Sequence, residues 1–314
     1  MKYKTLISIQ IGLWSCIIVI LIGIFGYSLY KDFSTESIDT LKSSNEAEYT
    51  VKVADANTIK IELVSEEVEV FVSSEEDIRI VQVTSYNLKE EDRLRVKTSG
   101  KTLTINKKKI NYSFNFLHGL NRSETITVYI PKSFSKELEI KTVSGSIDVQ
   151  NLQLEKIRCS STSGYIRIED LQTEEELRSN SVSGDIILNQ VNSNLIDINT
   201  TSGRIESYKV AGETIKNTTT SGNVEFMGTC NKFKHNTTSG NLEASFNKMF
   251  KEATISSVSG DVNIEIPEND GFKVEYDTVS GDLTSKFSLD NYMYKKDIAK
   301  IIVKTTSGNL NIEK

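Results

Sequence analysis

The stretch 137–170, ELEIKTVSGSIDVQNLQLEKIRCSSTSGYIRIED, decides the fold because it contains two copies of one motif. In each copy, alternating apolar residues flank a Ser-Gly pair on both sides. The motif recurs as TVSG, STSG, SVSG or TTSG, with successive glycines 18 to 21 residues apart and a last interval of 27. A nearly fixed period indicates repeats that pack on their neighbours. The glycines are Gly145, Gly164, Gly184, Gly203, Gly222, Gly240, Gly260, Gly281 and Gly308.

Apolar and polar residues alternate on both sides of each glycine. The residues seven before and two after the glycine are apolar in all nine copies, as Leu138 and Ile147 are around Gly145. A period of two is typical of strands and not of helices. About 19 residues are too few for two parallel strands joined by a helix. The sequence therefore predicts an all-β fold, a parallel β-solenoid of about 19-residue coils, with Ser-Gly corners where glycine lets coils approach closely.

The alternation also predicts which side chains point inward. The positions seven, five, three and one before each glycine share one phase, and the last two carry Thr or Ser and then Ser. We expect both hydroxyl rows to form ladders inside the corner, with a spacing of about 4.8 Å. A hydroxyl can both donate and accept, so such ladders satisfy themselves. The Val or Thr between the two rows is expected to point outward.

The first thirty residues predict a membrane anchor. Residues 5–30 carry no charged side chain, and at about 1.5 Å per residue they can cross a ~30 Å hydrocarbon core as a transmembrane helix. Lys2 and Lys4 precede this span, so the positive-inside rule favours a cytoplasmic N-terminus, residues 1–4. The sequence thus predicts a single-pass protein of the cell membrane with its β domain outside the cell.

The remaining chain divides into three parts. Residues 31–48 are polar and rich in serine, and we expect them to form a tether. Residues 49–135 alternate less regularly and are expected to form irregular N-terminal coils and a cap. Residues 136–314 carry the regular repeats and are expected to form the solenoid itself.

The composition excludes several classes of protein. Asp and Glu total 43 against 37 Lys and Arg, a net charge of -6, which argues against nucleic acid as a partner. Two His and three Cys argue against a His-based metal site or a disulfide scaffold, so no cofactor or metal is expected. Cys159 and Cys230 fall more than three coils apart, beyond disulfide reach at about 4.8 Å per coil. We expect both to be free thiols.

Two segments interrupt the repeat and are candidates for partner contact. Segment 106–122, NKKKINYSFNFLHGLNR, is either a protruding hairpin that touches a glycan, a partner or the lipid surface, or a hairpin that caps the solenoid. Segment 286–300, KFSLDNYMYKKDIAK, is either a second contact surface or a C-terminal plug. The candidate contact residues are Lys107, Lys108, Lys109, Tyr112, Phe114 and Phe116.

Some polar residues receive structural interpretations. His235 and Asn217 occupy the same phase in adjacent coils and are expected to form a hydrogen-bonded internal pair. Aspartate follows the corner glycine in three copies, but Arg and Tyr take that position elsewhere, which a metal ladder would not tolerate. We expect these aspartates to be solvated corner residues. They are Asp185, Asp261 and Asp282.

The repeated [ST]-[VT]-S-G-x-[ILV] motif, preceded by TVYIPKSF at 127–134, resembles the bacterial putative adhesin family of β-strand-repeat domains. This is a family of domains of unknown function. The resemblance covers about 50–314 and implies a β-solenoid fold, with an N-terminal membrane span that is common in such proteins. Some relatives resemble components of envelope-stress operons. The resemblance implies no catalytic residues.

These observations favour a non-enzymatic cell-envelope protein, a membrane-anchored, adhesin-like ectodomain for binding or scaffolding. The expected partners are the membrane through residues 5–30, and a cell-wall polymer, an envelope protein or a second copy of the chain. One alternative is an accessory or regulatory component of an envelope-stress response that acts on a membrane partner. Another is a polysaccharide-active β-helix enzyme. The outward position beside Ser-Gly is Val or Thr throughout, however, and supplies no acid–base chemistry.

Overall fold

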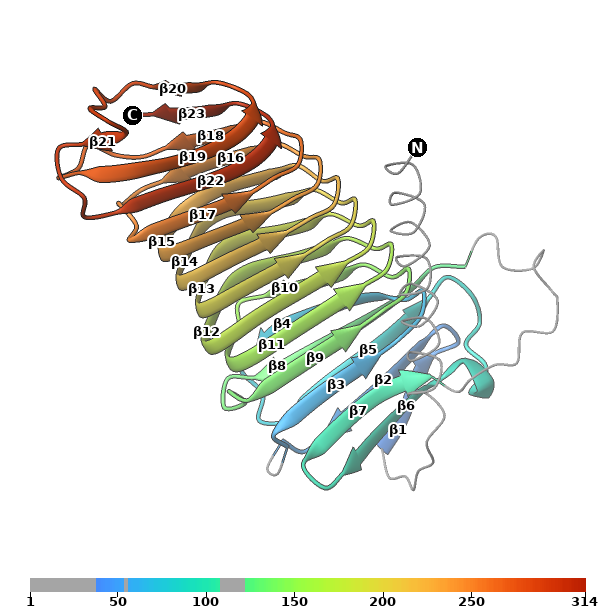
Figure 1. Cartoon of the computed structure of the whole chain (residues 1–314). Helices are drawn as coiled ribbons and strands as arrows, with labels where there is room; N and C mark the ends of the chain where they lie inside the picture. Colours follow the sequence, from blue (N-terminus) through green and yellow to red (C-terminus); the bar gives the residue numbers. More distant parts are fainter. Residues whose placement is uncertain (1–37, 54–55, 108–121) are drawn as a thin grey trace, which may run out of the picture.

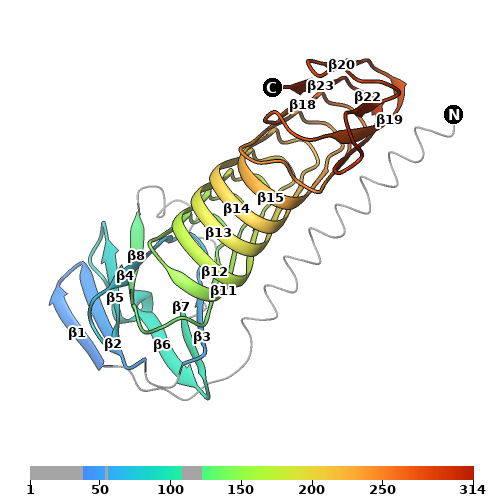
Figure 2. The ribbon, with the colours of Figure 1, turned by 90° about the vertical axis from the view of Figure 1, so that its left-hand side faces the viewer.

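A computed structural model describes residues 38–53, 56–107 and 122–314. In this part of the chain every element is a strand except one short 3-10 helix, η1 (Glu90–Asp92). The strands stack into one elongated body, with the N-terminal strands at one end and the C-terminus at the other (Figure 1). Figure 2 shows the same coils wound around a common axis.

The N-terminal strands are β1 (Ile38–Ser43), β2 (Glu46–Val51), β3 (Thr58–Glu62), β4 (Glu67–Ser73), β5 (Ile78–Thr84), β6 (Leu94–Ser99), β7 (Thr102–Lys107) and β8 (Glu124–Pro131). The strands of the regular coils are β9 (Glu137–Lys141), β10 (Ile147–Gln150), β11 (Gln153–Ser161), β12 (Ile166–Ser181), β13 (Ile186–Asn199), β14 (Ile205–Thr218), β15 (Val224–Asn236), β16 (Leu242–Phe246), β17 (Glu252–Ser256) and β18 (Val262–Glu265). The last strands are β19 (Phe272–Ser280), β20 (Leu283–Ser285), β21 (Met293–Tyr294), β22 (Lys300–Ser307) and β23 (Leu310–Glu313).

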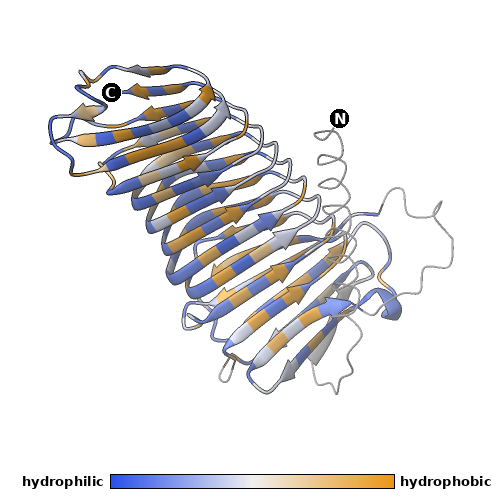
Figure 3. Cartoon of the chain, in the orientation of Figure 1, coloured by the Kyte–Doolittle hydropathy of each residue, from blue (hydrophilic) through white to orange (hydrophobic). Residues whose placement is uncertain are grey.

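Successive coils pair in parallel with equivalent residues aligned. Ile147 pairs with Ile166, which pairs with Ile186, and Leu138 pairs with Ile157 in a second row. All five side chains are buried, so the period-two alternation does direct the apolar residues to a shared interior. Figure 3 shows this alternation along the strands. The expected all-β, solenoid-like fold is confirmed.

The glycine corner is a point of very close approach between coils. A Cβ built on Gly222 would lie 1.9 Å from the carbonyl oxygen of Gly203, and one on Gly164 would lie 2.1 Å from that of Gly145. A Cβ built on any of the other corner glycines would likewise lie 2.3 Å or less from a backbone oxygen of the neighbouring coil. No side chain fits in such a space. Glycine is therefore required here because the coils touch.

A hydroxyl three residues before the glycine closes each of several corners. Ser161, Thr200 and Thr219 are buried, and their hydroxyls accept the N–H of the following corner glycine at 2.9, 3.1 and 2.8 Å. The serine directly before the glycine is exposed in all nine copies. The expectation of a second inward hydroxyl row is wrong, because the chain leaves the strand phase where this turn begins. The Val or Thr between them does point outward, and Val279 is 85% exposed.

A second corner lies six residues after the glycine in four coils. Asn151, Asp170, Gln190 and Lys209 have positive φ angles of 59°, 50°, 55° and 53°. These left-handed residues bend the chain inside a coil, so that β12, β13 and β14 each continue along more than one side. Asn and Asp tolerate this conformation better than most residues. That preference is the one sequence signal that could have revealed the corner.

The last two coils are stacked out of chain order. Strand β22 lies between β17 and β19, and β23 lies between β18 and β20. The C-terminal strands therefore form the penultimate coil, while β19 and β20 form the outermost one. Gly308 accordingly contacts Gly260, and Gly281 contacts Gly308. The long interval before Gly308 supplies the length with which the chain doubles back.

The N-terminal part contains one further coil, formed by β3 and β4. Its corner is Val64-Ser65-Glu66, and the Val64 carbonyl accepts the N–H groups of Val143 and Ser144 at 3.0 and 2.7 Å. Gly145 packs against the carbonyl of Glu66. Glu66 occupies the position at which later coils have glycine. The sequence analysis missed this coil because its corner lacks the Ser-Gly pair.

The other N-terminal strands pair mainly in the antiparallel sense. Strands β1, β2, β5 and β8 form one antiparallel series, and β6 and β7 form a hairpin. Strand β1 and the start of β2 lie within 31–48, so the tether prediction is wrong from Ile38 onward. These residues pair with neighbouring strands instead of remaining free.

Among the described residues, no helix has the length and apolar character needed to cross a membrane. The span expected at residues 5–30 lies outside the described part of the chain.

The solenoid interior is mostly apolar but includes unusual polar groups. Asn217 and His235 pair in register on β14 and β15, and both are fully buried. Neither the Asn217 amide nor the His235 imidazole makes a hydrogen bond, so the prediction of a hydrogen-bonded pair is wrong. Burial lowers the pKa of His235 to about 4. Cys159 and Cys230 are buried free thiols, and burial raises the pKa of each to about 12.

His235 should make the stability of the fold depend on pH. Its folded pKa of about 4 lies below the unfolded value of about 6.5. The contribution of the neutral imidazole to the free energy of unfolding is therefore complete above pH ~6.5. It is lost as the pH falls towards ~4, and the loss amounts to up to about 3 kcal/mol. Between pH 7 and pH ~4.5, we expect the melting temperature of wild type to fall further than that of His235→Leu. Asn217→Leu, a neighbouring substitution that removes no titrating group, should show the same dependence of melting temperature on pH as wild type. Equal slopes for wild type and His235→Leu would contradict this expectation.

Candidate functional site

The outer edge of the glycine corners carries two exposed polar rows. One consists of the serines before each glycine, and the other of the residues directly after it. In the second row, Asn241 Oδ1 accepts the Asp261 N–H at 3.0 Å, Asp261 Oδ1 accepts the Asn309 N–H at 2.8 Å, and Asn309 Oδ1 accepts the Asp282 N–H at 3.0 Å. These bonds follow the spatial order of the coils and not the chain order. They hold the side chains in a straight ladder.

At the C-terminal corners this edge is hollowed into a shallow concavity of about 480 Å³. Exposed hydroxyls of Ser259, Ser280 and Ser307 lie beside the carboxylates of Asp261 and Asp282. As expected from the sequence, these two aspartates and Asp185 are solvent-exposed corner residues. No group of three or more His, Cys, Asp or Glu side chains within the described ranges is placed to hold a metal ion. The concavity offers hydroxyl, carboxylate and amide groups, which suit a ligand rich in hydroxyls and amides.

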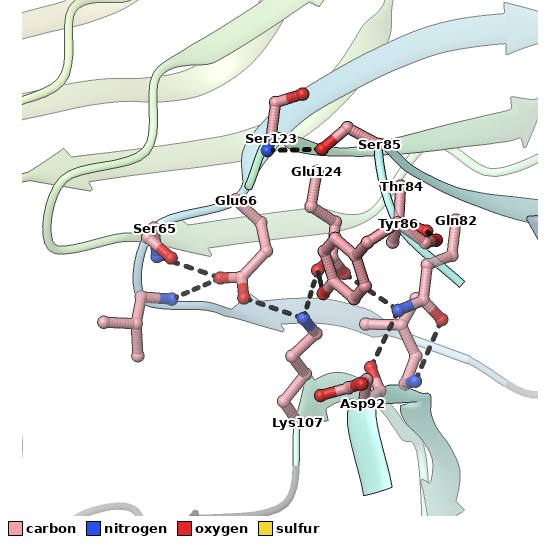
Figure 4. Close-up of polar contacts among 12 residues, drawn as sticks. Ser65, Glu66, Gln82, Thr84, Ser85, Tyr86, Asp92, Lys107, Ser123 and Glu124 are labelled. Atoms are coloured by element: carbon pink, nitrogen blue, oxygen red, sulfur yellow. Dashed lines mark hydrogen bonds and ion pairs between the residues drawn. The ribbon is translucent and has the colours of Figure 1, made fainter. Parts of the chain in front are cut away.

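A second polar cluster lies at the opposite end of the solenoid, around Lys107 (Figure 4). The Lys107 ammonium is 3.0 Å from the Glu66 carboxylate and also forms an ion pair with Glu124. Glu66 Oε2 accepts the N–H groups of Val64 and Ser65 at 2.8 and 2.9 Å. Burial alone would raise the pKa of Glu66, but Lys107 and the backbone N–H of Val64 hold it below its usual value. Burial opposes the charge of Lys107, yet the two glutamates raise its pKa.

Further hydrogen bonds extend this cluster into the sheet. Glu124 accepts from the Tyr86 hydroxyl at 2.9 Å and from Gln82 Nε2 at 2.8 Å. Gln82 Oε1 in turn accepts from the Tyr49 hydroxyl at 3.1 Å. Burial and the Glu124 carboxylate raise the pKa of Tyr86. The cluster joins the corner of the first coil to β5, β7 and β8, and it holds the end of β7 against the start of β8.

The structure places the candidate contact residues in two groups. Lys107 points into the fold, and its ammonium forms ion pairs with Glu66 and Glu124. The other candidates lie outside the described residues, and the hypothesis of a contact hairpin rests on them. They are Lys108, Lys109, Tyr112, Phe114 and Phe116.

The segment 286–300 closes the C-terminal end and also leaves part of itself exposed. The rings of Phe287 and Tyr294 pack with each other and against Phe272, with centroids 4.9 to 5.5 Å apart. Tyr292 and Met293 are 55% and 38% exposed. The segment therefore covers the interior of the last coil and presents three large apolar side chains to solvent, Tyr292, Met293 and Ile298.

Comparison with protein families identifies this architecture. The family model described as Toastrack DUF4097 matches residues 56–313, a range that contains every glycine corner. The chain belongs to the Toastrack DUF4097 family. This result confirms the expected membership of a family of domains of unknown function. No curated protein matches the sequence.

Solved structures share the fold of this Toastrack chain at low sequence identity. A putative adhesin from Parabacteroides merdae is 14% identical with a TM-score of 0.54, and the match covers 86% of this chain and 97% of that one. A putative lipid binding protein from Parabacteroides distasonis is 17% identical with a TM-score of 0.51, with the same coverage. At these identities the likeness shows the fold alone.

The cluster around Lys107 predicts a stability effect. Lys107→Met should leave the buried carboxylates of Glu66 and Glu124 without their cation, at a cost of about 2–4 kcal/mol. We expect a fall in melting temperature of at least ~4 °C. Lys101→Met, at an exposed turn, is the control and should melt within ~1 °C of wild type. A Lys107→Met protein as stable as the control would show that this ion cluster does not support the fold.

Proposed function

We propose that this chain is a non-enzymatic binding or scaffolding protein of the bacterial cell envelope. Residues 5–30 anchor it in the membrane as a transmembrane helix, with residues 1–4 inside and the β domain outside the cell. The uncharged span in the sequence supports the anchor. Membership of the Toastrack family and a fold shared with a putative adhesin support the binding role.

The observation that carries the proposal is the concavity at the C-terminal corners. Exposed hydroxyls of Ser259, Ser280 and Ser307 line it together with Asp261 and Asp282, and the backbone beneath them is fixed by stacked coils. Because the side chains of adjacent coils repeat at about 4.8 Å, the surface presents the same groups several times in line. A polymer with repeating hydroxyl and amide groups can match such an array. A cell-wall polysaccharide is therefore the proposed ligand.

Co-sedimentation of the full-length protein, in detergent, with isolated cell-wall sacculi tests this function. Wild type should bind, and Ser307→Trp should weaken binding at least ~10-fold because its ring fills the concavity. Ser183→Trp alters an equally exposed serine of the same row outside the concavity and should stay within ~2-fold of wild type. Absence of wild-type binding, or equal losses in the two variants, would contradict the proposal.

A further inference from the structure

The two long sides of the solenoid face away from each other. Inside the coils, the Phe226 ring near the start of β15 packs on the Phe233 ring near its end, with centroids 5.0 Å apart. Inward side chains from the two halves of a coil therefore meet in the core. Successive residues of a strand point to opposite faces. The outward side chains of the two halves consequently project from opposite surfaces of the molecule.

One surface carries a row of three carboxylates, of which only Glu206 forms an ion pair among the described residues. Glu206, Glu225 and Glu243 pair in register on β14, β15 and β16, so their backbones are about 4.8 Å apart. Arg204 contacts Glu206 at 2.8 Å. Within the described part of the chain, no Lys or Arg lies within ion-pair distance of Glu225 or Glu243. We call these three glutamates the acidic ladder.

The opposite surface carries a row of lysines on the same two central strands. Lys216 and Lys234 pair in register on β14 and β15, and Lys232 lies beside them. None of these three forms an ion pair among the described residues. Two acids pair in register with these lysines, Asp197 with Lys216 and Glu252 with Lys232. Asp197 is engaged by Arg178 at 3.5 Å, and Glu252 accepts a hydrogen bond from the Thr254 hydroxyl at 3.2 Å. We call these three lysines the basic ladder.

Elsewhere the solenoid compensates its charged rows. Arg158 forms ion pairs with Glu137 and Glu176 on the neighbouring coils, and Arg167 lies 3.6 Å from Asp148. Like charges directly opposite each other across strands are destabilising. The acidic and basic ladders therefore depart from the rule that the same sheets follow a few coils away.

An apolar strip accompanies the acidic ladder. Tyr208 and Met227 pair in register two residues beyond Glu206 and Glu225, and Met227 is 42% exposed. On the other surface, Leu195 is half-buried and pairs with Thr214, two residues before Lys216. Each ladder thus has an apolar neighbour, as specific interfaces combine a hydrophobic centre with charged surroundings.

We propose that copies of this chain associate side by side, with the acidic ladder of one copy against the basic ladder of the next. Both ladders have the same coil spacing, and the lysines lie on the two adjacent strands β14 and β15, so opposite charges on the two copies can align along these two coils. The two ladders lie at the same height on opposite surfaces. Each contact therefore leaves one free ladder on each copy, and the association continues into a row. This inference goes beyond the proposed function and does not depend on a wall ligand.

Sedimentation velocity of the full-length chain in detergent tests the proposal. Wild type should associate at ~20 mM salt and dissociate at ~500 mM, because salt screens exposed charges. Glu225→Lys and Lys234→Glu should each weaken association at least ~10-fold. A mixture of the two variants should associate again, because the intact basic ladder of Glu225→Lys meets the intact acidic ladder of Lys234→Glu, and the exchanged charges are opposite at the other contact.

Matched controls place the same charge changes away from the ladders. Glu76→Lys and Lys101→Glu lie on exposed turns of the N-terminal part and should associate as wild type does. Circular dichroism should show that all variants are folded. A wild-type chain that remains a single species at low salt would overturn the proposal. So would association that neither ladder variant weakens, which is the result expected if residues 5–30 drive it, or association that only one ladder variant weakens.

Discussion

The contact on which the structure depends is the one between the carbonyl of one corner glycine and the α-carbon of the next. At Gly222 the space for a Cβ is already taken by the Gly203 carbonyl oxygen, 1.9 Å away. This contact fixes both the distance and the register between coils. Because each coil alone buries too few side chains to offset its ordering entropy, register at the corner aligns the apolar rows that stabilise the stack.

Much of the fold can be predicted from the sequence because the same constraint recurs in every coil. The alternation around Gly145 correctly places Leu138 and Ile147 in the core. The serine row fails because a threonine or serine hydroxyl closes the turn first, and alternation cannot reveal where a strand ends. Glu66 escapes detection for a related reason. As the first corner of the stack it has no preceding glycine corner pressed against it, so it can carry a side chain.

The polar sites were harder to predict because they form between residues distant in sequence. Lys107 meets Glu66 and Glu124 only because β4, β7 and β8 converge, and no local pattern marks that meeting. The concavity at the C-terminal corners requires the last coils to be stacked out of order, which only the long interval before Gly308 suggests. In-register stacking explains the surface as well as the core. Where equivalent positions carry like residues, it produces rows of serines, carboxylates or lysines.

The melting temperature of Gly222→Ala, beside that of Ser221→Ala, tests the central claim most directly. Ser221 is exposed and next to the corner glycine, so its substitution changes neither the packing nor the backbone contact. We predict that Gly222→Ala destabilises the fold by at least ~2 kcal/mol and lowers the melting temperature by several degrees, because its methyl group meets backbone atoms that cannot move independently. Ser221→Ala should melt as wild type does. Equal melting temperatures for the two variants would contradict the claim that contact at the glycine corner holds the coils in place.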